Sequence, residues 1–101
     1  MDRVTNVQAI TSRVIEDYAT RSLNSKLYYI HDDTRKIDSV LVVPLKRDIE
    51  PHIMVMTRIE GDQVIIEADT TDRPLDEALV AAGIPRAQIV LAYSGEIASL
   101  A

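Results

Sequence analysis

The spacing of the apolar residues changes after the first part of this chain, and that change limits the folds it can adopt. In the first twenty residues they recur every three or four positions, which places them on one face of an amphipathic α-helix. Asp2 or Thr5 can cap the start of this helix, and Thr5 with Gln8 has the spacing of a capping box. We expect the helix to end within residues 20–24, where Ser, Thr and Asn compete for backbone hydrogen bonds. The apolar face consists of Val4, Val7, Ile10, Val14, Ile15, Tyr18 and Ala19.

From Lys26 to Asp69 the pattern indicates β-strands instead. The continuous apolar run of residues 40–43 predicts a strand that is covered on both faces. Pro44 should end that strand, because proline cannot donate a hydrogen bond to a neighbouring strand. The predicted strands are rich in β-branched and aromatic residues and are separated by polar turns; they are residues 27–30, 37–43, 52–59 and 64–68.

The third and fourth predicted strands form a hairpin. Gly61 lies in its turn and can adopt a positive φ without steric cost. Met54, Met56 and Ile65 are expected on the outer face of the sheet, and a half-apolar outer face is often covered by another chain. We therefore expect a homo-oligomer. Alternation predicts that the inner face carries Ile53, Val55, Thr57 and Ile59 from one strand and Val64, Ile66 and Ala68 from the other.

A second, short helix is predicted after the hairpin. Thr71 or Asp72 can cap its start, and Pro74 falls in its first turn, where a missing N–H costs nothing. Gly83 suits the left-handed position after its end, with Ile84 folding back onto the helix at Leu79 as in a Schellman motif before Pro85 blocks continuation. Residues 89–93 then form a final buried strand.

This order of elements predicts a fold class and a domain organisation. Helix, four mainly antiparallel strands, helix and strand indicate an α+β protein with its helices on one face of a single sheet. A helix between the last two strands permits a parallel crossover connection, so we expect a mixed sheet. Residues 1–101 contain no repeat or flexible linker, and we expect one domain.

Composition excludes several classes of function. Eleven Lys and Arg residues against 16 Asp and Glu give a net charge of -5, which disfavours direct binding to nucleic acid. The chain has no Cys, Trp or Phe, so thiolate chemistry is excluded and base-stacking platforms are scarce. Neither a signal peptide nor a membrane-spanning run is recognisable, and we expect a cytoplasmic protein with no membrane partner.

Two groups of residues could form a ligand site. His31 and His52, with Asp32, Asp33 and Glu50 near them in sequence, could bind a divalent metal if their strands were neighbours, but the ligand spacing is loose and solvated positions explain them better. Residues 69–72 place two carboxylates and two hydroxyls where a strand meets a helix. This corner could bind a ligand, but the neighbouring carboxylates oppose an anion, and helix capping is the simpler interpretation.

The remaining candidates carry little chemistry. Ser94 precedes Gly95, but its surroundings do not match the G-x-S-x-G pattern of a nucleophile elbow. Tyr28 and Tyr29 are interpreted as one surface ring and one core ring. Arg35-Lys36 and Lys46-Arg47 are interpreted as solvated basic pairs in loops. We therefore predict no catalytic, cofactor-binding or metal-binding residue and a protein that is not an enzyme. The alternative is a small α+β domain, possibly an enzyme, that binds a metabolite or metal at the corner or at the histidines.

The second half of the chain resembles the XisI family. The likeness is carried by RIEGDQVIIEADTT at residues 58–71, LVAAGIP at residues 79–85 and IVLAY at residues 89–93. Residues 15–19 resemble the first helix of the family and residues 32–35 its acidic turn, so the likeness covers nearly the full chain. The family pattern also has Trp or Phe in the strands and a Pro-x-x-Arg tail. This chain lacks those aromatics and has different residues at 94–101, so we expect an altered partner contact there.

The resemblance implies a cyanobacterial element-excision controlling factor. Members are associated with excision of the fdxN element during heterocyst differentiation, alongside XisH and the recombinase XisF. They are viewed as accessory regulators, and no catalytic residue is carried over from them. The resemblance thus implies a non-enzymatic protein that acts through a protein partner of the XisH type.

Overall fold

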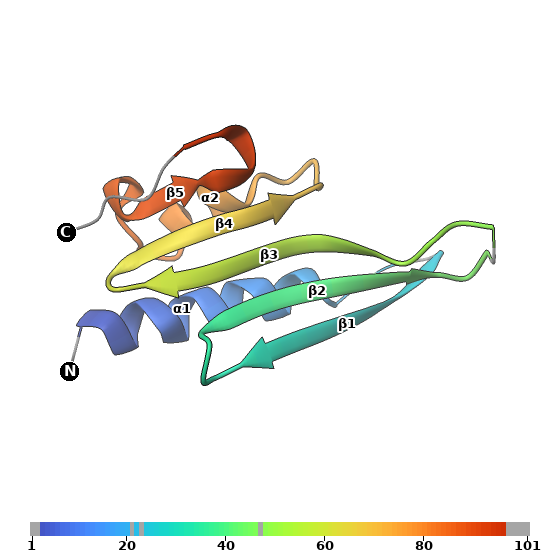
Figure 1. Ribbon diagram of the computed structural model, residues 1–101, viewed down its shortest axis with the longest axis horizontal. Helices are drawn as coiled ribbons and strands as arrows, with labels where there is room; N and C mark the ends of the chain where they lie inside the picture. The colour runs from blue at the N-terminus through green and yellow to red at the C-terminus, as the bar shows by residue number, and fades with distance from the viewer. Residues whose placement is uncertain (1–2, 21, 23, 47, 97–101) are drawn as a thin grey trace.

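The computed structural model describes residues 3–20, 22, 24–46 and 48–96, with side chains from residue 6 onward (Figure 1). Its elements follow the predicted order, with a 3₁₀ turn on each side of the last strand. They are α1 (Arg3–Tyr18), β1 (Ser25–Asp32), β2 (Ile37–Pro44), β3 (His52–Glu60), β4 (Gln63–Asp69), α2 (Leu75–Ala81), η1 (Arg86–Gln88), β5 (Ile89–Leu91) and η2 (Ala92–Ser94). None of the helices in the described residues is long and apolar enough to cross a membrane.

The five strands form one mixed sheet with both helices on the same face. The strand order is β1-β2-β3-β4-β5; the first four strands are antiparallel and β5 is parallel to β4. In Figure 1 α1 lies behind β2 and β3, and α2 lies behind β4 and β5. The predicted α+β class, the mixed sheet and the one-sided placement of the helices are therefore confirmed.

The core lies between the helices and the sheet. From α1 it takes Val7, Ile15 and Tyr18, with Ile10 and Val14 packed at its edge, as the helical spacing predicted. The helix ends at Tyr18, slightly before the predicted region. The proposed caps Asp2 and the Thr5 side chain, and the side chain of Val4, lie outside the described residues. The sheet and the second helix complete the core with Val40, Val55, Ile59, Val64, Ile66, Leu75, Leu79, Ile84 and Ile89.

Two β-bulges make the predicted alternation of the hairpin wrong at three positions. Val40 pairs with Val55 but Leu41 pairs with Ile53, so Met54 is the extra residue on β3. Met54 consequently packs against the core, while Ile53 turns to the outer face opposite Leu41. The physical reason is that one inserted residue shifts every later side chain to the other face.

The second bulge inserts Glu67 into β4. Met56 pairs with Ala68 and Thr57 with Ile66, so Ala68 shares the outer face with Met56 rather than the inner face with Ile66. The inserted Glu67 accepts a hydrogen bond from Arg58 Nε at 3.0 Å. Met56 and Ile65 are on the outer face as predicted.

The second helix ends as predicted but begins differently. Gly83 has a φ of 113°, its N–H donates to Val80 O at 3.0 Å, and the Ile84 N–H donates to Leu79 O at 3.1 Å, which together form a Schellman motif. At the start, Pro74 precedes the helix as its N-cap residue, and neither Thr71 nor Asp72 provides a side-chain cap. The predicted capping by Thr71 or Asp72 and the predicted place of Pro74 in the first turn are therefore wrong. Asp69, at the end of β4, instead accepts the hydrogen bond from the first N–H of the helix.

The last strand is shorter than predicted. It covers only Ile89–Leu91, and the chain turns into η2 at Ala92. Tyr93 therefore lies in a 3₁₀ turn and is exposed, not part of a buried strand. Gly95, with a φ of 96°, ends that turn. Of residues 94–101, which differ from the family tail, those beyond residue 96 lie outside the described residues.

Candidate functional site

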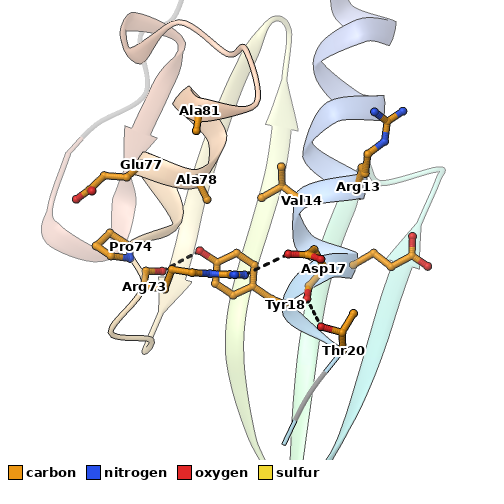
Figure 2. Close-up of a pocket in the computed structure, with 11 residues that line it drawn as sticks. Arg13, Val14, Asp17, Tyr18, Thr20, Arg73, Pro74, Glu77, Ala78 and Ala81 are labelled. Atoms are coloured by element: carbon orange, nitrogen blue, oxygen red, sulfur yellow. Dashed lines mark hydrogen bonds and ion pairs between the residues drawn. The ribbon is translucent and has the colours of Figure 1, made fainter.

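An open groove of about 820 Å³ runs between α1 and α2 (Figure 2). Val14, Ala78 and the ring of Tyr18 supply apolar surface in this groove. Charged side chains surround it, so the groove suits an apolar segment of a partner that carries charged neighbours. The lining residues are Arg13, Val14, Glu16, Asp17, Tyr18, Thr20, Arg73, Pro74, Glu77, Ala78 and Ala81.

Tyr18, at the end of α1, and Arg73, in the loop before α2, connect the two walls of the groove. The Tyr18 hydroxyl donates to Arg73 O at 2.8 Å, and the Arg73 guanidinium carbon lies 3.9 Å from the centroid of the Tyr18 ring, as Figure 2 shows. Arg73 Nη2 also lies 3.6 Å from Asp17 Oδ2 in a solvent-exposed ion pair that contributes little. Burial raises the pKa of Tyr18, which keeps the phenol protonated as a donor. The contact joins residues 55 positions apart in the chain, so it fixes the loop before α2 against the end of α1.

The corner at residues 69–72 is occupied by its own backbone. Asp69 Oδ1 accepts a hydrogen bond from the Thr71 N–H at 3.0 Å, and Oδ2 accepts one from the Leu75 N–H at 2.8 Å. Thr71 Oγ1 lies 2.7 Å from both Asp69 Oδ1 and Arg73 O. Its hydroxyl has a single proton and can donate it to only one of these acceptors at a time. Of the two interpretations of this corner, capping therefore fits, but the capping residue is Asp69.

A second polar cluster surrounds the buried carboxylate of Asp38 on β2. The Asp38 side chain is only 4% exposed. Oδ2 accepts a hydrogen bond from Ser12 Oγ at 2.8 Å, while Oδ1 accepts one from the Tyr29 hydroxyl at 2.8 Å and one from His31 Nδ1 at 2.5 Å. Three elements, α1, β1 and β2, thus meet at one carboxylate.

Sheet register explains why these side chains meet. His31 pairs directly with Asp38, and Tyr29 pairs with the next inward residue, Val40. The Tyr29 and His31 rings are stacked with centroids 6.3 Å apart. Sequence reasoning missed Asp38, although one signal was available: it shares the inward face of its strand with Val40 and Val42, and a carboxylate on a buried face requires partners.

The cluster orients donors and does not generate a nucleophile. Burial, reinforced by the hydrogen bond to Asp38, raises the pKa of Tyr29 to about 12, so its phenol stays protonated. Ser12 donates to the carboxylate, and His31 uses Nδ1 for the same carboxylate, so the imidazole is not placed as the base of Ser12. The arrangement therefore ties α1 and β1 to β2.

We expect the contribution of His31 to stability to depend on pH. Its hydrogen bond to Asp38 raises the pKa of His31, with Asp33 adding to the shift and partial burial opposing it. Because the pKa of His31 is higher in the folded protein than in the unfolded chain, its contribution to the free energy of unfolding is fully present below the unfolded-state pKa of about 6.5. That contribution is lost as the pH rises through the folded-state pKa. Urea unfolding of the wild type and His31→Gln should therefore show a difference that shrinks above about pH 6.5. A His31 NMR titration below its ordinary pKa would contradict this expectation.

The two histidines are not brought together. His31 pairs with Asp38 and His52 with Val42, so they lie about 13 Å apart along β2 at a rise of about 3.3 Å per residue. His52 is exposed, with Nδ1 3.3 Å from Glu50 O. In the part of the chain that the structure describes, no group of three His, Cys, Asp or Glu side chains could hold a metal ion.

The other sequence candidates have local roles. Ser94 Oγ donates to Leu91 O at 3.0 Å, and Arg35 pairs with Asp32 in the turn between β1 and β2. Lys36 and Lys46 lie at opposite ends of β2, so the basic pairs do not converge; Arg47 lies outside the described residues. Tyr29 packs against the core and Tyr28 is 48% exposed, which confirms one core ring and one surface ring.

These features define a class of small α+β domain: a mixed five-stranded sheet, helices on one face and an open groove between those helices. The XisI protein family model matches residues 1–98, and the chain belongs to this family. The resemblance that the sequence indicated is thereby confirmed. No match is found among the curated proteins.

Two solved structures share the fold. A XisI-like protein from Anabaena variabilis ATCC 29413 has a TM-score of 0.77 and 22% sequence identity, covering 87% of this chain and 84% of that chain. The fdxN element excision controlling factor XisI from the same organism has a TM-score of 0.74 and 21% identity, covering 91% of this chain and 93% of that chain.

Proposed function

We propose that this protein is an accessory factor of the XisI type, which controls excision of a DNA element by binding a protein partner and catalyses no step itself. The family match over residues 1–98 carries this proposal. A net charge of -5 supports an indirect role at DNA, because direct binding needs a surplus of cations to replace counterions on phosphates. The protein would act in the cytoplasm, as expected from the sequence.

We place the partner contact at the groove between α1 and α2. Its apolar surface at Val14 and Ala78 offers area to bury. Arg73 is paired with Asp17. The carboxylates of Glu16 and Glu77 outnumber the guanidinium of Arg13, which favours a segment with basic residues beside its apolar ones. The partner is a protein of the XisH type. Its docking segment would insert apolar side chains between the helices and pair its cations with these carboxylates.

Co-purification with a tagged XisH-type protein from the same genome tests the partner. Ala81→Arg adds a bulky cation at an exposed position that lines the groove, and it should abolish retention of the partner. Val80→Arg is the matched control, because Val80 is exposed on the same helix but does not line the groove. Failure of the wild type to retain the partner, or equal retention by both variants, would contradict the proposal.

Excision itself provides the second readout. In a host that carries the recombinase, the XisH-type protein and a plasmid with the element, adding this chain should change the fraction of excised plasmid. Ala81→Arg should remove that effect and Val80→Arg should keep it. A gel shift of element DNA by this chain alone, with a steep salt dependence, would favour direct binding instead.

A further inference from the structure

Strand β1 is a long, open edge of the sheet. It has eight residues, pairs with β2 without a bulge and, within the described residues, has no strand on its other side. In Figure 1 no helix or strand of the described part of the chain lies beyond it. Such an edge presents a row of backbone donors and acceptors to any chain that can pair with it.

The hydrogen-bond pattern identifies which backbone groups are open. The Leu45 N–H donates to Asn24 O at 3.0 Å, one position before the paired segment. Because bonded and non-bonded pairs alternate along antiparallel strands, the N–H and C=O groups of residues 25, 27, 29 and 31 point away from β2. These groups form a regular ladder with Tyr29 near its centre.

The outer face of β1 carries a self-complementary set of side chains. Leu27 and Tyr29 pack toward the core, so the alternate residues lie on the face without helices. Tyr28 and Ile30 are 48% and 45% exposed at the centre of that face. Lys26 lies before them and Asp32 after them, at equal distances from Tyr29.

We propose that β1 pairs antiparallel with β1 of a second copy of this chain about a two-fold axis at Tyr29. In this register Lys26 lies opposite Asp32 of the other copy, and Tyr28 lies opposite Ile30 of the other copy. Each cation thus meets a carboxylate and each exposed apolar side chain meets an apolar one. Asp32 also accepts hydrogen bonds from its own Arg35, and the pair with Lys26 adds to them.

The pairing joins two five-stranded sheets into one continuous sheet. The open backbone groups of Leu27, Tyr29 and His31 become bonded to their counterparts, and the apolar area of Tyr28 and Ile30 is removed from water. On the helix side, Tyr29 meets its own copy and Leu27 meets His31. Because one chain supplies both halves, the interface is isologous and closes at a dimer.

Cysteine cross-linking tests the register, because the chain has no native Cys. Residues 28 and 30 form a non-bonded pair in the proposed register, with Cα atoms about 4.5 Å apart, within reach of a disulfide. Mixed Tyr28→Cys and Ile30→Cys proteins should therefore cross-link on mild oxidation. Either variant alone should not, since diagonal positions lie about 7–8 Å apart. Efficient cross-linking within one single variant, or none in the mixture, would overturn the register.

Solution mass tests the dimer itself. Sedimentation of the wild type at micromolar concentrations should give twice the 11.3 kDa of the chain. Tyr28→Glu/Ile30→Glu changes only exposed positions, so it should keep the circular dichroism of the wild type and sediment as a monomer. Val80→Glu, exposed on α2, is the matched control and should remain dimeric. A monomeric wild type, or a dimer that the double variant leaves intact, would overturn the proposal.

Discussion

Replacing Asp38 with alanine should lower the free energy of unfolding by about 3 kcal/mol, since each buried donor that loses its acceptor costs about 1–3 kcal/mol. The carboxylate accepts hydrogen bonds from Ser12, Tyr29 and His31, and its side chain is 4% exposed. Alanine leaves the Ser12 and Tyr29 hydroxyls without this acceptor at a buried position of β2. Urea unfolding followed by circular dichroism measures the loss.

Two further variants isolate the cause. Asp38→Asn keeps a carbonyl oxygen that can accept from one or two of the donors, so its loss should be smaller than that of Asp38→Ala. Asp72→Ala is the matched surface control, because Asp72 is exposed and is not part of this cluster. If Asp38→Ala were no more harmful than Asp72→Ala, the cluster would not hold α1 and β1 to β2.

The features that sequence predicted correctly depend on residues close together in the chain. The Schellman ending requires only Gly83 and the residues beside it, and the hairpin turn requires only Gly61 between two apolar runs. The first helix follows from the spacing of its own apolar residues. In each case the local conformation and the global fold demand the same residue types, so a local pattern is sufficient.

The features that sequence missed depend on distant residues. The bulges at Met54 and Glu67 are set by how β3 fits both of its neighbours, which alternation within one strand cannot reveal. Ser12 and Asp38 are 26 positions apart, and Tyr18 and Arg73 are 55 apart. The residues of the Asp38 cluster and those of the groove therefore do not form a contiguous motif in the sequence.

The groove and the β1 edge can be used independently. No residue that lines the groove belongs to β1, and the groove is built from α1, the loop before α2 and α2 itself. A dimer through β1 would thus present two grooves and could bind two partner chains. Loss of the dimer in Tyr28→Glu/Ile30→Glu should leave partner binding at each groove, so the two proposals fail separately.

Asp69→Ala should destabilise the protein by about 1–2 kcal/mol, the upper range for loss of a helix cap. Pro74 has no N–H, so the Leu75 N–H is the first donor of α2, and Asp69 Oδ2 accepts from it at 2.8 Å. Oδ1 holds the turn through the Thr71 N–H at 3.0 Å. The same carboxylate therefore fixes both the loop that carries Arg73 and the start of the helix behind it.

The matched control distinguishes this cap from the one that sequence suggested. Asp72 is exposed and provides no cap, so Asp72→Ala should change the free energy of unfolding by less than about 0.5 kcal/mol. Thermal and urea unfolding of both variants measure the two effects. Because the groove includes Arg73, Asp69→Ala should also weaken retention of the XisH-type partner, whereas Asp72→Ala should not. Equal destabilisation by both variants would contradict Asp69 as the capping residue, since Asp72 would then supply part of the cap.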